Sequence, residues 1–236
     1  MGIDFRSTAA EAAAVEQTRE LQGIHPSVQL VRWADGRLEI SGTCGFTVEV
    51  AGQRVEAAYE LKMLLGEDFP KSVPVVWETE GTINRKFEHL MSDDSLCLGA
   101  EVEILRRWRE RPHLLSFVSD AVVPYLAAHA YWQEHGSFPL GALKHGPDGV
   151  LQYYGEYFGV SPTGAVWLVK LLAEGYVAMQ RCPCGTGKRV RDCHWTALES
   201  LRVVKSREFF GANLRTILAN RGKRTRDILA PRRTVR

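Results

Sequence analysis

The chain has 236 residues, 45% of them apolar, so it is too apolar to be disordered and long enough for a domain with an appended module. Its net charge is only +2, yet residues 202–236 carry eleven Lys and Arg against two acidic residues. No segment approaches the roughly 20 apolar residues of a membrane-spanning helix, and the N-terminus lacks the basic and apolar regions of a signal peptide. We therefore expect a cytoplasmic protein with no membrane partner.

The first third of the chain has the pattern of a helix followed by an antiparallel sheet. Residues 7–23 are rich in strong helix formers. Asp35-Gly36 is a strong hairpin turn signal, and apolar and polar residues alternate over 54–65. We predict an α+β fold: a four-stranded antiparallel meander over 28–33, 37–50, 54–65 and 73–77, with flanking helices. A bend is expected at Gly42 to Gly45, where Cys44 has a structural role.

The remainder of the chain has helical spacing of its apolar residues. Pro124 is expected to kink or break the helical region that begins near Ile104. A short helix is predicted over 149–159, and Ser161-Pro162 is a good start for the next helix, which runs to Leu172.

A single cysteine, Cys97, follows an acidic turn in a loop predicted over residues 79–96. An accessible thiol that can ionise is a nucleophile able to carry an acyl group. The alternative is that Cys97, flanked by two leucines, is a small buried apolar residue, as unpaired cysteines commonly are.

The order of these features resembles the ubiquitin-conjugating enzyme fold over roughly the first 135 residues. The matching parts are the helix and meander over 7–78, the Phe69-Pro70 and Pro74 element, and the segment Asp94-Ser95-Leu96-Cys97-Leu98. The resemblance implies that Cys97 carries the C-terminus of a ubiquitin-like protein as a thioester and transfers it to an amine.

The chain departs from that family because the His-Pro-Asn motif is absent. His89 lies eight positions before Cys97 and is followed by Leu90-Met91, so it is either the substitute for the motif or a structural histidine. Asp93 and Asp94 are candidates for lowering the pKa of an incoming lysine or orienting it, and Asp94 is the one we assign to the site, whereas an aspartate pair in a turn commonly only makes the turn.

Bacterial relatives of conjugating enzymes commonly lack this motif, and this chain resembles that class more closely. The resemblance implies an activating enzyme as a partner and an antiphage defence operon as the context. It also implies a cyclic-nucleotide synthase, whose C-terminus becomes conjugated, as a partner.

The segment RCPCGTGKRVRDCHW, residues 181–195, is the most specific motif in the chain. Cys182, Cys184, Cys193 and His194 supply three thiolates and an imidazole, a complete tetrahedral set for a structural zinc ion. The alternative is a group of unrelated reduced cysteines. The pattern resembles the SEC-C zinc-binding motif, which implies partner binding.

These features divide the chain into four parts: a conjugating-enzyme-like domain over 1–158, a helical connector over 159–180, the zinc motif over 181–195 and a basic helical tail over 196–236. Helical spacing over 199–220 places Phe210, Leu214, Ile217 and Leu218 on one stripe. The basic tail is predicted to contact nucleic acid, the ribosome or an acidic partner such as the acidic body of the chain itself, and of these nucleic acid is not favoured. The alternative is a solvated terminus. The competing hypothesis for the whole protein is a catalytically silent binding module, or a translation or secretion accessory, that acts through the zinc motif.

Overall fold

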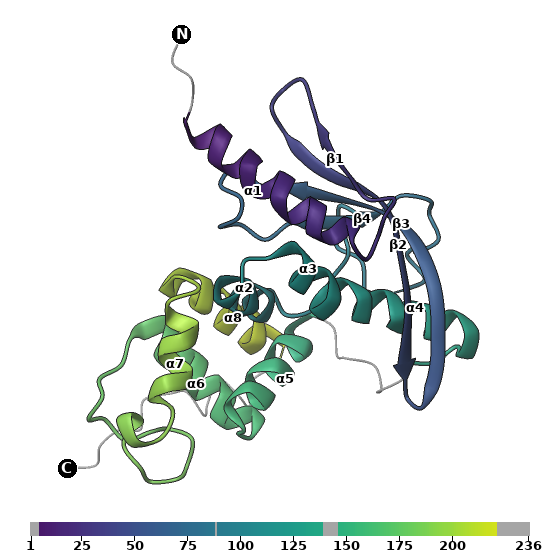
Figure 1. Ribbon diagram of the computed structural model, residues 1–236. Coiled ribbons are helices and arrows are strands. Elements are labelled where there is room, and N and C mark those ends of the chain that lie inside the picture. Colours follow the sequence, from purple (N-terminus) through teal and green to yellow (C-terminus); the bar gives the residue numbers. More distant parts are fainter. Residues whose placement is uncertain (1–4, 88, 139–145, 221–236) are drawn as a thin grey trace, which may run out of the picture. The chain divides into compact units, whose positions relative to one another are not determined.

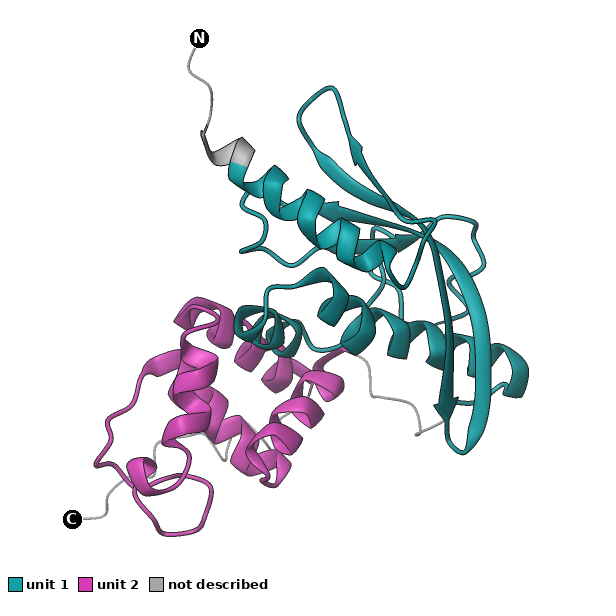
Figure 2. Cartoon of the chain, viewed as in Figure 1, with its two compact units in different colours: residues 1–142 teal, residues 143–236 magenta. Residues whose placement is uncertain are grey.

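A computed structural model describes residues 5–87, 89–138 and 146–220. The chain forms two compact units, Met1–Ala142 and Leu143–Arg236 (Figure 2). None of the described helices is long and apolar enough to span a membrane.

The first unit is a four-stranded antiparallel sheet with helices (Figure 1). The strands follow one another in the order β1-β2-β3-β4, so each pairs with its neighbour in the sequence. This confirms the predicted α+β class and the four-stranded meander. The elements in chain order are α1 (Phe5–Gln22), β1 (Gln29–Arg32), β2 (Leu38–Val50), β3 (Gln53–Leu65), β4 (Val75–Glu78), α2 (Glu101–Glu110), α3 (Leu114–Phe117), a π-helical turn η1 (Val118–Val122) and α4 (Val123–His135).

The longest pairing in the sheet is the β2–β3 hairpin. Ala51 and Gly52 both have positive φ, 50° and 78°, as a two-residue hairpin turn requires. This turn sets the register, which pairs Val50 with Gln53 and continues to Leu38 and Leu65. The core face of β3 is the predicted one; its buried residues are Val55, Tyr59, Leu61, Met63 and Leu65.

Strand β2 continues through Gly42 to Gly45 and stays paired with β3 there, so the chain does not leave the sheet at the position of the predicted bend. Gly42 has a φ of 141°, and a Cβ there would lie 2.6 Å from the carbonyl oxygen of Ser27. The glycine is therefore needed for the close approach of the chain that leads into β1, and it does not interrupt the strand. Cys44 is buried in the sheet core, in agreement with its expected structural role.

Two side chains tie the helices to the rest of the first unit. The Gln17 amide in α1 donates to the Pro112 carbonyl and accepts from the Leu114 N–H at the start of α3. The indole N–H of Trp108 in α2 donates to the Pro70 carbonyl at 2.8 Å. These three bonds lie beside a core that includes the fully buried Leu21, Ile40, Leu114 and Leu126.

The expected irregularity at Pro124 takes the form of a π-helical turn. Residues Leu114–Phe117, Val118–Val122 and Val123–His135 follow one another without a gap, and the wider turn ends two positions before the proline. A proline has no N–H to continue the helical bonding, and a wider turn accommodates that loss.

The second unit contains α5 (Gly146–Phe158), α6 (Pro162–Glu174), the 3-10 turn η2 (Val190–Asp192), α7 (Trp195–Arg202) and α8 (Arg207–Asn220). Helix α6 packs against both α5 and α8, and the Ser161 side chain caps it as predicted by accepting from the Gly164 N–H. The first compact unit ends at Ala142, so α5 belongs to the second unit. The sequence-based division had placed the end of the first domain at residue 158, after α5.

The predicted helix over 199–220 is in fact two helices, because the chain leaves the helical conformation between Arg202 and Arg207. On α8 the buried members of the predicted stripe are Phe210 and Ile217. The zinc motif and these helices are parts of one compact unit rather than separate domains. The basic residues beyond Asn220 lie outside the described part of the chain.

Candidate functional site

Cys97 lies at the end of a short turn that we call the Cys97 loop, residues 89–98. The backbone N–H of Cys97 donates to the His89 carbonyl at 2.9 Å, and the Met91 N–H donates to the Ser95 carbonyl at 2.8 Å. Between these two bonds, Leu90 and Leu96 form an isolated antiparallel bridge. The loop thus folds as a small hairpin, although the sequence has no clean strand pattern there.

The two aspartates at the tip of this loop have different roles. The Asp93 carboxylate accepts hydrogen bonds from the hydroxyl and the N–H of Ser95, at 2.6 and 3.1 Å, and these bonds lower the pKa of Asp93. Asp94 has a φ of 63°, and its exposed carboxylate pairs with Arg85 at 2.6 Å. Asp93 therefore closes the turn, as the structural alternative supposed, while Asp94 presents its carboxylate to solvent.

The Cys97 loop is attached to the outer side of β4. The Leu96 N–H donates to the Val76 carbonyl at 2.8 Å, and the Trp77 indole N–H donates to the Asp93 carbonyl at 3.1 Å. Leu96 is buried, whereas Cys97 is only half-buried. The leucine thus anchors the segment and leaves the following thiol nearer to the surface.

Helix α4 supplies a second contact to the loop through Tyr125. Its hydroxyl donates to the same His89 carbonyl at 2.9 Å, so Tyr125 and Cys97 share one acceptor. Burial, and then the negative charge of Cys97 in its thiolate form, raise the pKa of Tyr125. Tyr125 therefore stays protonated and keeps donating. Sequence reasoning missed this residue, because only folding brings α4 to the loop.

The His89 ring lies in an aromatic cluster next to the loop. Its centroid is 5.3 Å from that of Phe87 and 5.1 Å from that of Phe138. The structure therefore brings His89 and Cys97 together through the backbone, and it places the imidazole among rings.

A buried polar pair that the sequence did not reveal lies in the same aromatic cluster. The Tyr59 hydroxyl on β3 and His129 Nδ1 on α4 share a hydrogen bond of 2.8 Å, and the Phe87 ring packs edge-on against His129. Burial lowers the pKa of His129 to about 4, against a smaller opposing effect of Glu78. His129 is therefore neutral at physiological pH and joins the sheet to α4.

The second candidate site is the Cys3His cluster predicted from the sequence. The ligand atoms of its four residues all lie within 4.8 Å of one another. His194 Nδ1 is 3.2 Å from the sulfur of Cys182 and 3.2 Å from that of Cys193, and the Cys184 and Cys193 sulfurs are 3.5 Å apart. Four soft donors this close together can surround a single metal ion.

The backbone of the metal loop is suited to this convergence. Gly185 and Gly187 have left-handed φ values of 93° and 75°, which allow the chain to turn between the cysteines. The Cys182 N–H donates to the Lys188 carbonyl at 2.8 Å and closes the loop. The two glycines of the motif are therefore needed for conformational reasons.

The protein also orients the ligands. His194 Nε2 lies 3.0 Å from the Phe158 carbonyl oxygen, which can only accept, so Nε2 carries the proton and Nδ1 faces the sulfurs. The Thr186 hydroxyl lies 3.1 and 3.3 Å from the Cys184 and Cys193 sulfurs. Burial raises the pKa of Cys184, but hydrogen bonds from Thr186 and the other two cysteines outweigh it and lower the pKa to about 6. One thiol is therefore readily ionised for a metal.

Two comparisons with known proteins gave no match. No family model matches the chain, and no curated protein matches it at a significant level.

Proposed function

We propose that the first unit is a ubiquitin-conjugating-enzyme-like transferase with Cys97 as its acyl carrier. The single observation that carries this proposal is the position of Cys97, half-buried at the end of a hydrogen-bonded loop on the outer side of β4. The element order of a helix, a four-stranded meander and then helices supports it. Cys44, the other cysteine of this unit, is only 3% exposed and is unsuited to the task.

In the proposed reaction the Cys97 thiolate attacks the thioester carbonyl that joins a carrier protein's C-terminus to an activating enzyme. A new sulfur–carbon bond forms, and the activating enzyme's thiolate leaves. An amine then attacks the Cys97 thioester, a carbon–nitrogen bond forms, and the Cys97 thiolate leaves with the amine's proton passing to solvent. The carrier is a ubiquitin-like protein or another protein C-terminus, and the defence context with a cyclic-nucleotide synthase stays part of the proposal.

Two further residues have assigned parts in this proposal. Asp94 lies three positions before the thiol on the exposed side of the loop, where its carboxylate attracts an incoming ammonium group. Its pair with Arg85 is solvent-exposed and is therefore weak enough to exchange. His89 holds the Cys97 backbone through its carbonyl oxygen.

For the second unit we propose a structural zinc ion held by the Cys3His cluster. Three thiolates and one imidazole leave no vacancy for water, which is typical of a structural rather than a catalytic ion. The ion would join the metal loop to the end of α5, because His194 is bonded to Phe158. The rival hypothesis, a silent binding module, would use this unit and leave Cys97 without a chemical role.

The test is a reconstituted reaction with the activating enzyme and carrier encoded beside the gene, together with ATP. We expect an adduct that thiols release, that Cys97→Ala abolishes and that Cys44→Ala retains. Absence of any adduct on wild-type protein under conditions that charge the activating enzyme would favour the silent binding module.

A further inference from the structure

The outer edge of β3 is open over more than half of the strand. Strand β2 pairs with all of β3 on one side, whereas β4 pairs only with the segment from Leu61 to Leu64 on the other. Just past the end of β4, the Thr79 N–H donates to the Glu60 carbonyl at 2.9 Å. This is the last bond to the outer edge of β3 before the open segment begins. Among the described residues, none forms a strand beside residues 53–59 on this side.

The hairpin register shows which backbone groups face this open edge. Since the Glu60 carbonyl points toward Thr79, away from β2, the backbone groups of every second residue before it point the same way. These residues are Arg54, Glu56 and Ala58. Within the described part of the chain no strand bonds to their N–H and C=O groups, which form a row suited to pairing with another strand. Residues 53–59 contain no proline, lysine or bulge of the kind that commonly blocks pairing.

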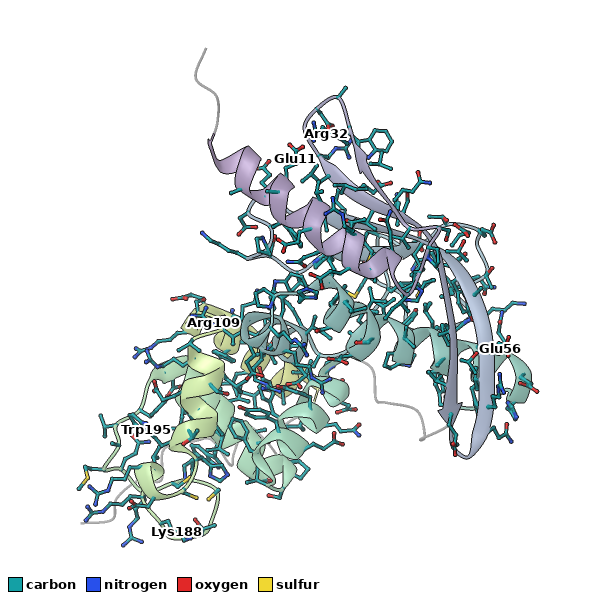
Figure 3. The ribbon with its side chains drawn as sticks, in the orientation of Figure 1. Glu11, Arg32, Glu56, Arg109, Lys188 and Trp195 are labelled. Atoms are coloured by element: carbon teal, nitrogen blue, oxygen red, sulfur yellow. The ribbon has the colours of Figure 1, made fainter. Side chains whose placement is uncertain are left out.

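A hollow lies beside this edge and provides space for an added strand. It is lined by residues 54–59 of β3, by Thr82 and by Ala130, Gln133 and Glu134 of α4. Three of its lining residues, Ala57, Ala58 and Ala130, are small and leave room for a backbone to approach. Figure 3 shows Glu56 on this part of the β2–β3 hairpin.

The charges on the edge are self-complementary. Arg54 and Glu56 lie two positions apart on the solvent face, with side chains 76% and 71% exposed. If a second copy pairs antiparallel about Val55, Arg54 of each chain lies opposite Glu56 of the other, and this happens twice by symmetry. Gly52 and Ala58 then lie opposite each other, and neither is bulky.

The other open edge of the hairpin lacks this property. The Ser27 hydroxyl accepts from the Thr43 N–H at 3.1 Å, so residues 43, 45, 47 and 49 of β2 face outward there. Thr47 and Glu49 offer no opposite charges to a second copy.

We propose that two copies of this chain associate through the β3 edges, with antiparallel pairing centred on Val55, to form one continuous sheet that contains the strands of both copies. The proposal does not rest on the chemistry of Cys97.

The experiment is sedimentation velocity on the full chain over a concentration series. We expect wild-type protein to dimerise reversibly, and Arg54→Glu or Glu56→Arg to weaken the dimer at least about tenfold, because each places like charges opposite each other twice. An equimolar mixture of the two variants should restore the dimer, because a chain that is acidic at both positions then faces a chain that is basic at both. The double variant with both changes should also dimerise like wild type.

Arg37→Glu, an exposed charge reversal in the turn between β1 and β2 and away from residues 53–59, is the control and should leave the dimer unchanged. Circular dichroism checks that each variant is folded. Wild-type protein that stays monomeric at about 200 μM, a concentration at which even weak edge pairing should be visible, would overturn the proposal. A dimer that resists both charge reversals, or a mixture that fails to restore it, would overturn it equally.

Discussion

Tyr125 and Cys97 donate to the same acceptor, the carbonyl oxygen of His89, each at 2.9 Å. The shared oxygen fixes the backbone of the proposed nucleophile between the sheet and α4. A thiol that must meet two different proteins in turn benefits from such a fixed position, since less conformational freedom is lost at each encounter.

The two cysteines of the first unit should differ in reactivity. Cys97 is half-buried, whereas Cys44 is buried and its burial raises its pKa to about 11. We expect iodoacetamide to alkylate Cys97 at least about ten times faster than Cys44 in the folded protein, because the thiolate is the reacting form. Peptide mass spectrometry on a time course measures both rates. Faster labelling of Cys44 would show that the exposed thiol has been misassigned.

Metal content tests the second unit. We expect one equivalent of zinc in the purified protein by elemental analysis, and its loss in Cys182→Ser/Cys184→Ser together with a lower unfolding temperature. Cys97→Ala is the control that should keep the metal. Full metal occupancy in the double variant would refute the ligand assignment.

The buried histidine His129 should make stability depend on pH. Its pKa in the folded state is about 4, below the ordinary value of 6.5, so the unfolded chain takes up a proton first as the pH falls. The free energy of unfolding should therefore decrease from about pH 6.5 down to about pH 4.

Urea denaturation at several pH values measures this effect. His129→Gln should flatten the decrease, and the exposed His135→Gln should not. His25, whose pKa burial also lowers, should account for part of the remaining slope. An unchanged slope in His129→Gln would contradict the assignment.

Asp94 has both a left-handed backbone conformation and a negative charge. Three substitutions separate the contributions of the conformation and the charge to stability. Its left-handed φ of 63° suits Asn and Gly but disfavours Ala, so Asp94→Ala should cost about 1 kcal/mol of stability. Asp94→Asn and Asp94→Gly should be close to wild type, because the exposed ion pair with Arg85 contributes little. Urea denaturation of the three variants decides this. Equal losses in all three would show that the charge, not the conformation, stabilises the loop.

The sequence predicted the sheet and the metal cluster well, for physical reasons that are visible in particular residues. The alternation along β3 shows which face is buried, and all four metal ligands lie within one short segment whose glycines let the loop close. Both signals are local. Local sequence therefore suffices to find them.

The surroundings of Cys97 depend on contacts between distant segments, so the sequence could not reveal them. Tyr125 reaches the Cys97 loop only because α4 packs against the sheet, and the Tyr59–His129 pair forms for the same reason. Helix α5 belongs to the second compact unit because it packs against α6 and α8, and its apolar face does not itself indicate those partners.

The most direct test of the central claim is to locate the acyl group on the protein. Protein recovered from the reconstituted reaction is digested under non-reducing, mildly acidic conditions, which preserve thioesters, and the modified peptide is identified by mass spectrometry. The account predicts the carrier's C-terminal residues attached to the peptide that contains Cys97, and their release by dithiothreitol. Attachment to Cys44, to a cysteine of the metal cluster or to a lysine alone would contradict it.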